Sequence, residues 1–235
     1  MRVTEKLRTD ELIRNIEIHS WKMSRTYDKL SSQQEVSRPS DDPVRAGTVM
    51  RLTTHVRSLE QSREIILSAQ SMLDGAVGSL DRASELVSQA HAISLQACNA
   101  TLSPADREAL AAEVDQLLEV LVQTANESRD ERYLFGGTRT TGRPFEVTRS
   151  PEGEITSVSY AGSDTALLFP VGRGRNIVAS MTGDEAFDGC DVINSLISFR
   201  DNLLNRSGLA EEDLADALRD DMQALDDART HLLNQ

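Results

Sequence analysis

The stretch LTTHVRSLEQSREIILSAQSMLDGAVGSLDRASELV, residues 52–87, carries an apolar side chain at every seventh position. The six residues are Leu52, Leu59, Ile66, Leu73, Leu80 and Val87. A seven-residue apolar period is typical of a helix that packs lengthwise against other helices in a coiled coil. Small residues beside the repeat widen the apolar face, namely Ala69, Ala76, Ala83 and Ala90. The period predicts one helix over about 43–97, with the six larger side chains in the core of a rod.

The residues before this helix predict where it begins. Pro43 suits the first helical position, where a missing N–H costs nothing, and Asp42 suits the N-cap before it. Ser40 and Asp41 can accept hydrogen bonds from the same free amides, while Pro39 disfavours helix just before it, so an earlier helix should end near residue 37. A capping carboxylate keeps a low pKa, which favours a cap over a catalytic acid pair.

A second helix is predicted directly after the first. Ser103 is placed as an N-cap, Pro104 as the first helical residue and Asp106 as the residue that reaches back to the cap. Apolar residues then recur at four-three spacing: Leu110, Val114, Leu117, Leu121 and Ala125. The short turn between the two helices predicts an antiparallel helical hairpin, which forms the rod domain over 39–132.

The pattern changes at YLFGGTRTTGRPF, residues 133–145, where glycine and proline replace the helical period. The start of this outer β-rich domain, predicted over 133–190, is marked by Tyr133, Leu134, Phe135, Gly136 and Gly137. Two hairpins are expected, one over 145–160 and one over 166–181. Gly136 and Gly137 are interpreted as a sharp exit from the helical hairpin. GRGR, residues 172–175, is interpreted as a tight hairpin turn rather than as a phosphate loop.

Helical periodicity returns over 191–235, with one helix after Asp191 and a last one from about Leu209. These helices are expected to pack beside the central hairpin. The predicted fold class is therefore mainly α, a long antiparallel helical bundle or coiled coil that carries a small β-rich insertion.

The N-terminal segment, residues 1–38, has an apolar seam of its own at heptad positions, formed by Ile13, Ile16, Met23, Tyr27 and Leu30. No other segment is obviously free to cover it, so we expect it to be disordered in the monomer and buried by other chains on assembly. Acidic residues on its polar face disfavour a membrane surface as the partner.

Composition narrows the class of protein further. The net charge of −13 argues against nucleic acid as a partner. Cys98 and Cys190 form no disulfide or zinc pattern, and the four histidines are scattered. No run is apolar enough for a membrane helix or a cleaved signal peptide. We find no catalytic constellation and expect no enzyme, cofactor or metal.

Two motifs carry a family resemblance: LSSQQEVSRPSDDPVRAG, residues 30–47, and RYLFGGTRTTGRPF, residues 132–145. They resemble the bacterial flagellar hook-associated proteins, most closely the third of these families, that of the hook-filament junction, within the flagellin-like superfamily. Departures at Gln33, Gln34, Glu35 and Ser37 remove positive charge that is usual in the family.

The resemblance implies a structural adaptor between hook-associated protein 1 and the flagellin filament, with neighbouring copies of itself and an export chaperone as further partners. It implies an extracellular place in the flagellum after type III export without a cleaved signal peptide. It also implies that the terminal assembly helix of the family is missing after Gln235. Flagellin itself and, from another class, a cytoplasmic coiled-coil scaffold or signalling module are the alternatives; presence in sheared flagella would separate the last from the others.

Overall fold

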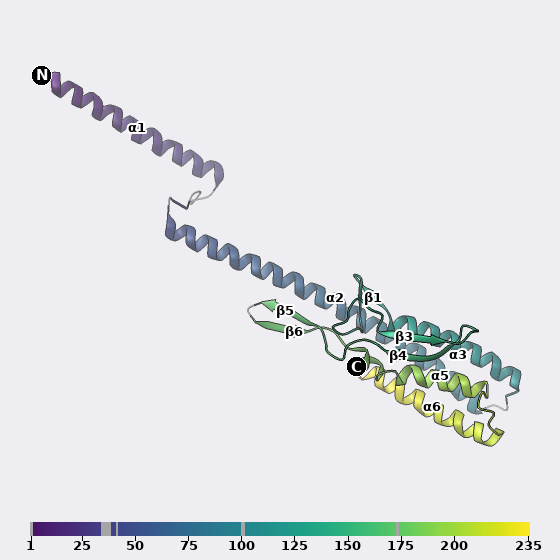
Figure 1. Cartoon of the computed structure of the whole chain (residues 1–235). Coiled ribbons are helices and arrows are strands. Elements are labelled where there is room, and N and C mark those ends of the chain that lie inside the picture. Colours follow the sequence, from purple (N-terminus) through teal and green to yellow (C-terminus); the bar gives the residue numbers. More distant parts are fainter. Residues whose placement is uncertain (1, 34–38, 41, 100–101, 173) are drawn as a thin grey trace. The chain divides into compact units, whose positions relative to one another are not determined.

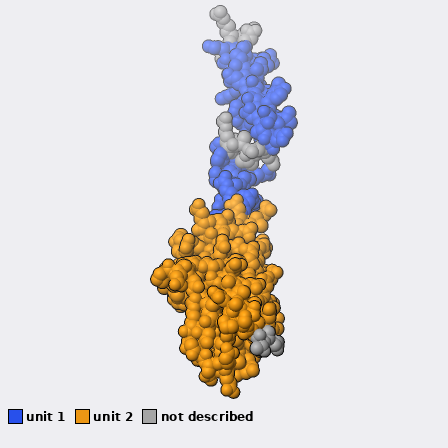
Figure 2. Space-filling model, turned by 90° about the vertical axis from the view of Figure 1, so that its right-hand side faces the viewer, with its two compact units in different colours: residues 1–61 blue, residues 62–235 orange. Residues whose placement is uncertain are grey.

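The computed structural model describes residues 2–33, 39–40, 42–99, 102–172 and 174–235 (Figure 1). The chain divides into two compact units, residues 1–61 and residues 62–235, which Figure 2 distinguishes by colour. We call them unit 1 and unit 2 and describe each by itself. The predicted class, mainly α with a small β-rich insertion, is confirmed.

Unit 1 contains the helix α1, Arg2–Ser32, and the beginning of the helix α2, Pro43–Asn99. The predicted cap is confirmed, because one carboxylate oxygen of Asp42 accepts hydrogen bonds from the backbone N–H groups of Val44 and Arg45 at 3.1 and 3.0 Å. Pro39 and Ser40 lie in a turn, and Asp41 lies outside the described residues.

The end of α1 differs from the prediction. The helix ends at Ser32 rather than near residue 37, because Gln33 adopts a left-handed conformation with φ 53°. A residue in this conformation ends a helix, since it turns the chain out of the helical path. The signal that Pro39 supplies therefore lies several residues beyond the actual end of the helix.

Unit 2 is built on the later part of α2 and three further helices: α3, Pro104–Ala125, α5, Asp191–Leu203, and α6, Glu211–Leu233. They lie alongside the C-terminal part of α2 (Figure 1), and their buried residues form one apolar cluster. The predicted capping box of α3 is confirmed: Ser103 Oγ accepts from the Asp106 N–H at 3.3 Å, and Asp106 Oδ2 accepts from the Ser103 N–H at 3.2 Å.

The heptad repeat of α2 is real, but the buried seam has a different phase from the predicted one. The side chains that α2 buries at four-three spacing are Ala69, Met72, Ala76, Ser79, Ala83, Leu86, Ala90, Ile93 and Ala97. The four alanines that the sequence analysis placed beside the repeat, Ala69, Ala76, Ala83 and Ala90, therefore lie at the centre of the buried seam. The large side chains of the contact come from elsewhere in the cluster, such as Leu118, Leu121 and Phe199. Small residues on one helix leave room for large ones opposite.

The predicted rod core needs correction for this reason. Leu80 and Val87 flank the alanine seam and are buried, whereas Leu52, Leu59, Ile66 and Leu73 are 40–58% exposed within the chain. Helix length explains the difference, because 57 residues of α2 extend about 86 Å while the 23 residues of α6 extend about 35 Å. A partner of that length covers less than half of α2.

The β-rich insertion consists of three two-stranded antiparallel sheets. The strands are β1, Ser128–Arg129, with β2, Arg132–Tyr133; β3, Phe145–Arg149, with β4, Ile155–Tyr160; and β5, Leu168–Gly172, with β6, Arg175–Val178. Both predicted hairpins are confirmed, while β1–β2 and the short helix α4, Gly183–Phe187, were not predicted.

The segment that begins the insertion is fixed by close backbone contacts. A Cβ on Gly137, whose φ is +59°, would lie 2.1 Å from the Ser163 carbonyl oxygen, so only glycine fits. Phe135 is fully buried, and its ring meets Phe187 edge-on with centroids 5.2 Å apart. Leu134 is buried and Tyr133 half-buried, and the buried residues of the insertion belong to the same cluster as the helices.

Candidate assembly interface

The five apolar residues predicted as an assembly seam all lie on α1, and all are exposed. The exposed fractions are 51% for Ile13, 64% for Ile16, 61% for Met23, 64% for Tyr27 and 75% for Leu30. Except for a polar residue at position 20, they follow four-three spacing, so they lie along one stripe of the helix. We call this set the α1 stripe.

The rest of α1 is exposed as well. Between Lys6 and Ser32 no side chain is buried, and Leu7, Leu12 and Trp21 each have about three-fifths of their surface in solvent. The Arg25 guanidinium lies 5.2 Å from the centre of the Trp21 ring on the same helix. Most helical stability in proteins comes from a packed apolar face. The described side chains of α1 form no such packed face within the chain.

The first half of α2 presents a second exposed stripe. In unit 1 it consists of Val49, Leu52, Val56 and Leu59, which are 50–58% exposed. In unit 2 the same register continues through Ile66, Leu73 and Val77, interrupted by Arg63 and Gln70. Leu52, Leu59, Ile66 and Leu73 are the part of the predicted rod core that the described chain leaves exposed. Together with Val49, Val56 and Val77 they form a surface of the same kind as the α1 stripe.

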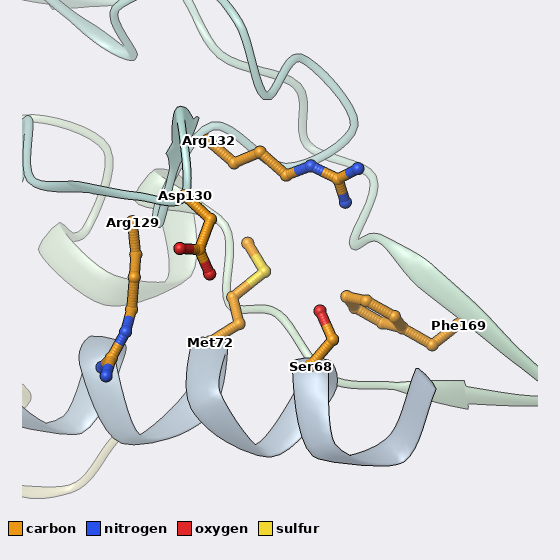
Figure 3. A pocket seen from close by; sticks show the side chains of 6 residues that line it. All are labelled: Ser68, Met72, Arg129, Asp130, Arg132 and Phe169. Carbon is orange, nitrogen blue, oxygen red and sulfur yellow. The ribbon is translucent and has the colours of Figure 1, made fainter. Parts of the chain in front are cut away.

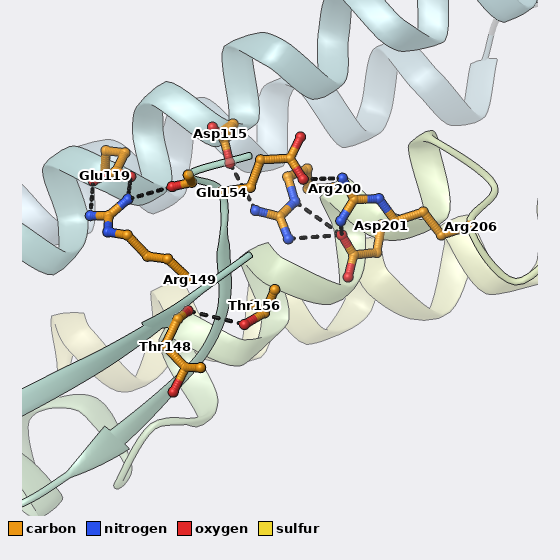
Figure 4. Close-up of polar contacts among 10 residues, drawn as sticks. Asp115, Glu119, Thr148, Arg149, Glu154, Thr156, Arg200, Asp201 and Arg206 are labelled. Carbon is orange, nitrogen blue, oxygen red and sulfur yellow. Dashed lines mark hydrogen bonds and ion pairs between the residues drawn. The ribbon is translucent and has the colours of Figure 1, made fainter. Parts of the chain in front are cut away.

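In unit 2, by contrast, a network of ion pairs around one buried arginine links neighbouring elements (Figure 4). The side chain of Arg200 in α5 is 1% exposed and donates to Asp115 in α3 at 2.8 Å and to Asp201 at 2.8 and 3.0 Å. Burial alone would lower the pKa of Arg200, but the hydrogen bonds to the two carboxylates outweigh it and raise the pKa. The cation is therefore fully compensated and ties α3 to α5.

The same network attaches the β3–β4 hairpin to the helices. Arg149 in β3 makes a two-pronged contact with Glu119 in α3, with one N–O distance of 2.9 Å. These hydrogen bonds lower the pKa of Glu119. Arg206 forms two ion pairs: one with Glu154, next to β4, and one with Asp201, where the N–O distance is 3.1 Å. The insertion is thus held at a defined place on unit 2 by charge-assisted hydrogen bonds.

A small hollow lies between α2, the β1–β2 turn and β5 (Figure 3). It is lined by Ser68, Met72, Arg129, Asp130, Arg132 and Phe169. Its three charged residues are all exposed, unlike the desolvated groups of a typical catalytic site. Across the described residues, no three His, Cys, Asp or Glu side chains are grouped to hold a metal ion.

None of the helices in the described part of the chain has the length and apolarity needed to span a bilayer. Unit 2 is a helical bundle that carries a small β-rich insertion, and apolar heptad stripes are exposed on α1 and on the first half of α2. These features define the class of protein: mainly helical, with long exposed apolar helix faces. The distinguishing features are the α1 stripe and the exposed part of α2, not a pocket.

Comparison with known proteins identifies the family. The chain belongs to the family of the bacterial flagellin N-terminal helical region, whose model matches residues 5–140. It is 25% identical over 189 residues to flagellar hook-associated protein 3 of Escherichia coli, covering 80% of this chain and 57% of that protein. It is 24% identical over 167 residues to the flagellar filament 41 kDa core protein of Borreliella burgdorferi, covering 69% of this chain and 50% of that protein.

The fold has a close counterpart among solved structures. A putative flagellar hook-associated protein from Vibrio parahaemolyticus superposes with a TM-score of 0.71 at 20% identity, over 84% of this chain and 85% of that one. The resemblance to hook-associated protein 3 that the sequence motifs indicated is confirmed. The chain spans little more than half the length of the curated relatives it matches.

Two features of the site were missed at the level of sequence. Arg200 sits four residues after Leu196 and one after Phe199, so it lies on the apolar face of its helix, and a charge on such a face signals a buried ion pair. The alanine seam was visible as a perfect seven-residue repeat of small residues, but size made the leucine repeat look like the core. The α1 stripe was recognised in full.

Proposed function

We propose that the protein is a structural subunit of the bacterial flagellum that joins hook-associated protein 1 at the hook to the flagellin filament. Its neighbours would be hook-associated protein 1, flagellin and copies of itself, with a chaperone during type III export. Family membership and the relative named hook-associated protein 3 support this proposal. The observation that carries it is the α1 stripe, because a helix that buries none of its side chains between Lys6 and Ser32 needs other chains to complete its packing.

The mechanism is mechanical. Apolar side chains of the α1 stripe would pack into a seam with helices of adjacent subunits, and each fully buried large side chain contributes about 1.5–3 kcal/mol. Unit 2 supplies a packed body to which Arg149 and Arg206 attach the β3–β4 hairpin through ion pairs. No bond is made or broken in this function.

The test is rescue of motility and filament attachment in a strain that lacks the protein. Wild-type chain should restore attachment, and Met23→Asp/Tyr27→Asp should not, because two carboxylates in a buried seam cannot be solvated. Ser24→Asp/Thr26→Asp adds the same charge on the same helix away from the stripe and serves as the matched control. Full rescue by the Met23/Tyr27 variant would contradict the proposal.

Flagellin is the second candidate, favoured by the relative named as a filament core protein. Antibody labelling of sheared flagella separates the two. The junction role predicts label in a short band at the boundary between hook and filament, whereas a filament subunit would be labelled along the whole length. Absence of the protein from sheared flagella would contradict both and favour a cytoplasmic scaffold.

A further inference from the structure

Asp221 of α6 is an unusual residue in unit 2. Its side chain is 7% exposed, and it is the one acidic residue among the buried side chains of the described chain. It faces α5, where the side-chain amide of Asn202 donates a hydrogen bond to Asp221 Oδ2 at 2.7 Å. One neutral donor is little compensation for a buried carboxylate, which normally requires a cation or several donors.

The groups that surround Asp221 do not supply a paired cation. Asn202 donates to it from α5, Asp220 precedes it on α6, and the Cys98 thiol of α2 is close enough to be influenced by both Asp221 and Arg219. Arg219 pairs with Asp216 on the exposed side of α6, and no ion pair within 4.0 Å is found for Asp221 in the described residues. Cys98 donates to the Leu218 carbonyl oxygen, so the thiol is engaged with the backbone of α6.

Arg200 provides the contrast within the same bundle. Both residues are buried charges on the helices of unit 2, but Arg200 has two carboxylate partners and Asp221 has none of opposite sign. The contact between α3 and α5 is therefore stabilised by its buried charge. The contact between α5 and α6 is weakened by its buried charge whenever the carboxyl is ionised.

We propose that the packing of α6 against α5 and α2 is controlled by a proton on Asp221: α6 is held firmly when the carboxyl is neutral and opens locally when it is ionised. Burial raises the pKa of Asp221 from 3.8 to about 6, against the opposing effect of the Asn202 hydrogen bond and with a small further rise from Asp220. A raised pKa in the folded state means that the proton stabilises the fold, so the stabilisation is present at low pH and is lost as pH rises through about 6.

The opening is confined to α6, because the Arg200 network keeps α3, α5 and the β3–β4 hairpin together at every pH in this range. At neutral pH the bundle then has one helix with a higher rate of opening than its neighbours. This goes beyond the structural role proposed above, and it holds for the isolated chain whether or not that role is correct.

Hydrogen exchange of the full chain at pH 5.0 and pH 7.5 tests the proposal, after correction for the intrinsic exchange rate at each pH. With carboxyl pKa values of 3.8 in the open and about 6 in the closed state, opening of α6 should increase about tenfold between the two pH values. Amides of α3 and α5 should change less than twofold. A uniform change in all three helices, or no change in α6, would overturn the proposal.

Variants identify the responsible group. Asp221→Asn keeps the shape and the capacity for hydrogen bonds but cannot ionise, so the pH dependence of α6 should fall below twofold and its protection at pH 7.5 should rise at least tenfold. Asp220→Asn removes the same charge from the exposed neighbour and should keep most of the pH dependence. Equal effects of the two variants would assign the dependence to net charge on α6 and contradict the proposal.

A direct titration of the Asp221 carboxyl carbon by NMR in the wild-type chain makes the test independent of any variant. A midpoint near pH 6 is expected. A midpoint near pH 4 would overturn the proposal, since a carboxyl that ionises normally gains nothing from its proton in the folded state.

Discussion

Unit 1 and unit 2 both carry seven-residue repeats on their helices, but only unit 2 buries one within the chain. In unit 2 the alanine seam of α2, with Ala76 and Ala83, is buried, although Ile66 and Leu73 of the leucine repeat stay 40% exposed, and a buried arginine is paired with two carboxylates. In unit 1 large side chains such as Leu59 and Tyr27 occupy the repeat and face solvent. The difference teaches that a repeat specifies a helix with a packing face, while the available partner decides whether that face is covered within the chain.

The largest expected effect compares one leucine from each unit. Leu121→Ala in α3 removes a fully buried side chain and should lower the free energy of unfolding by about 2–5 kcal/mol. Leu59→Ala, at a side chain that is 56% exposed, should change it by no more than about 0.5 kcal/mol. Urea denaturation of the monomer measures both, and similar losses at the two positions would break the distinction between the units.

The phase of the seam in α2 is tested by a pair of size changes. Ala83→Leu adds volume at a fully buried position of the seam and should cost about 1–3 kcal/mol. Leu73→Ala, at a residue that is 40% exposed, should cost clearly less. If thermal unfolding ranked the two the other way, the leucine repeat rather than the alanine repeat would be the core.

The pH dependence of stability sharpens the contrast between the two buried charges. Because the folded-state pKa of Asp221 is about 6 and lies above the ordinary value of 3.8, its contribution is greatest below about pH 4 and is lost between pH 4 and 7. Relative to Asp221→Asn, the wild-type chain should lose about 1–2 kcal/mol over this range after allowance for solvent screening. Urea unfolding at pH 4.5 and pH 7.0 measures the difference, and parallel pH profiles would contradict it.

The smallest expected effect is local to unit 1. Asp42→Ala removes the acceptor for the Val44 and Arg45 amides and should destabilise the first turn of α2 by about 1 kcal/mol. Exchange of these two amides should accelerate about fivefold, while unit 2 keeps its stability. Asp42→Asn retains a good capping group and is the control; an equal acceleration in that variant would exclude the cap as the cause.

Much of the fold could be predicted because its signals are local. The caps at Asp42 and Ser103, the two longer β-hairpins and the helices α3, α5 and α6 each follow from a few neighbouring residues. The phase of the seam could not be predicted reliably, because it depends on which face of α2 meets Leu118 and Phe199, residues distant in sequence. The β1–β2 turn was missed because Glu131 adopts a positive φ of 62° at a turn position where sequence rules expect glycine.

The same distinction between local signals and contacts distant in sequence applies to the residues of the candidate site. The α1 stripe was found because its spacing is complete within one helix. Arg200 and Asp221 were not, since their importance depends on burial by helices that only the folded chain brings together. An exposed stripe specifies the chemistry of the surface that covers it, and the identity of the covering chain is set by residues outside the stripe.

The most direct test of the account is hydrogen exchange of α1 in the dilute chain and in the assembled flagellar structure. Amides between Lys6 and Ser32 should exchange at nearly the intrinsic rate in the dilute monomer, while α3 and α5 are strongly protected, and α1 should gain protection of a hundredfold or more on assembly. Strong protection of α1 in a dilute monomer, or no gain on assembly, would show that the α1 stripe is not completed by neighbouring chains.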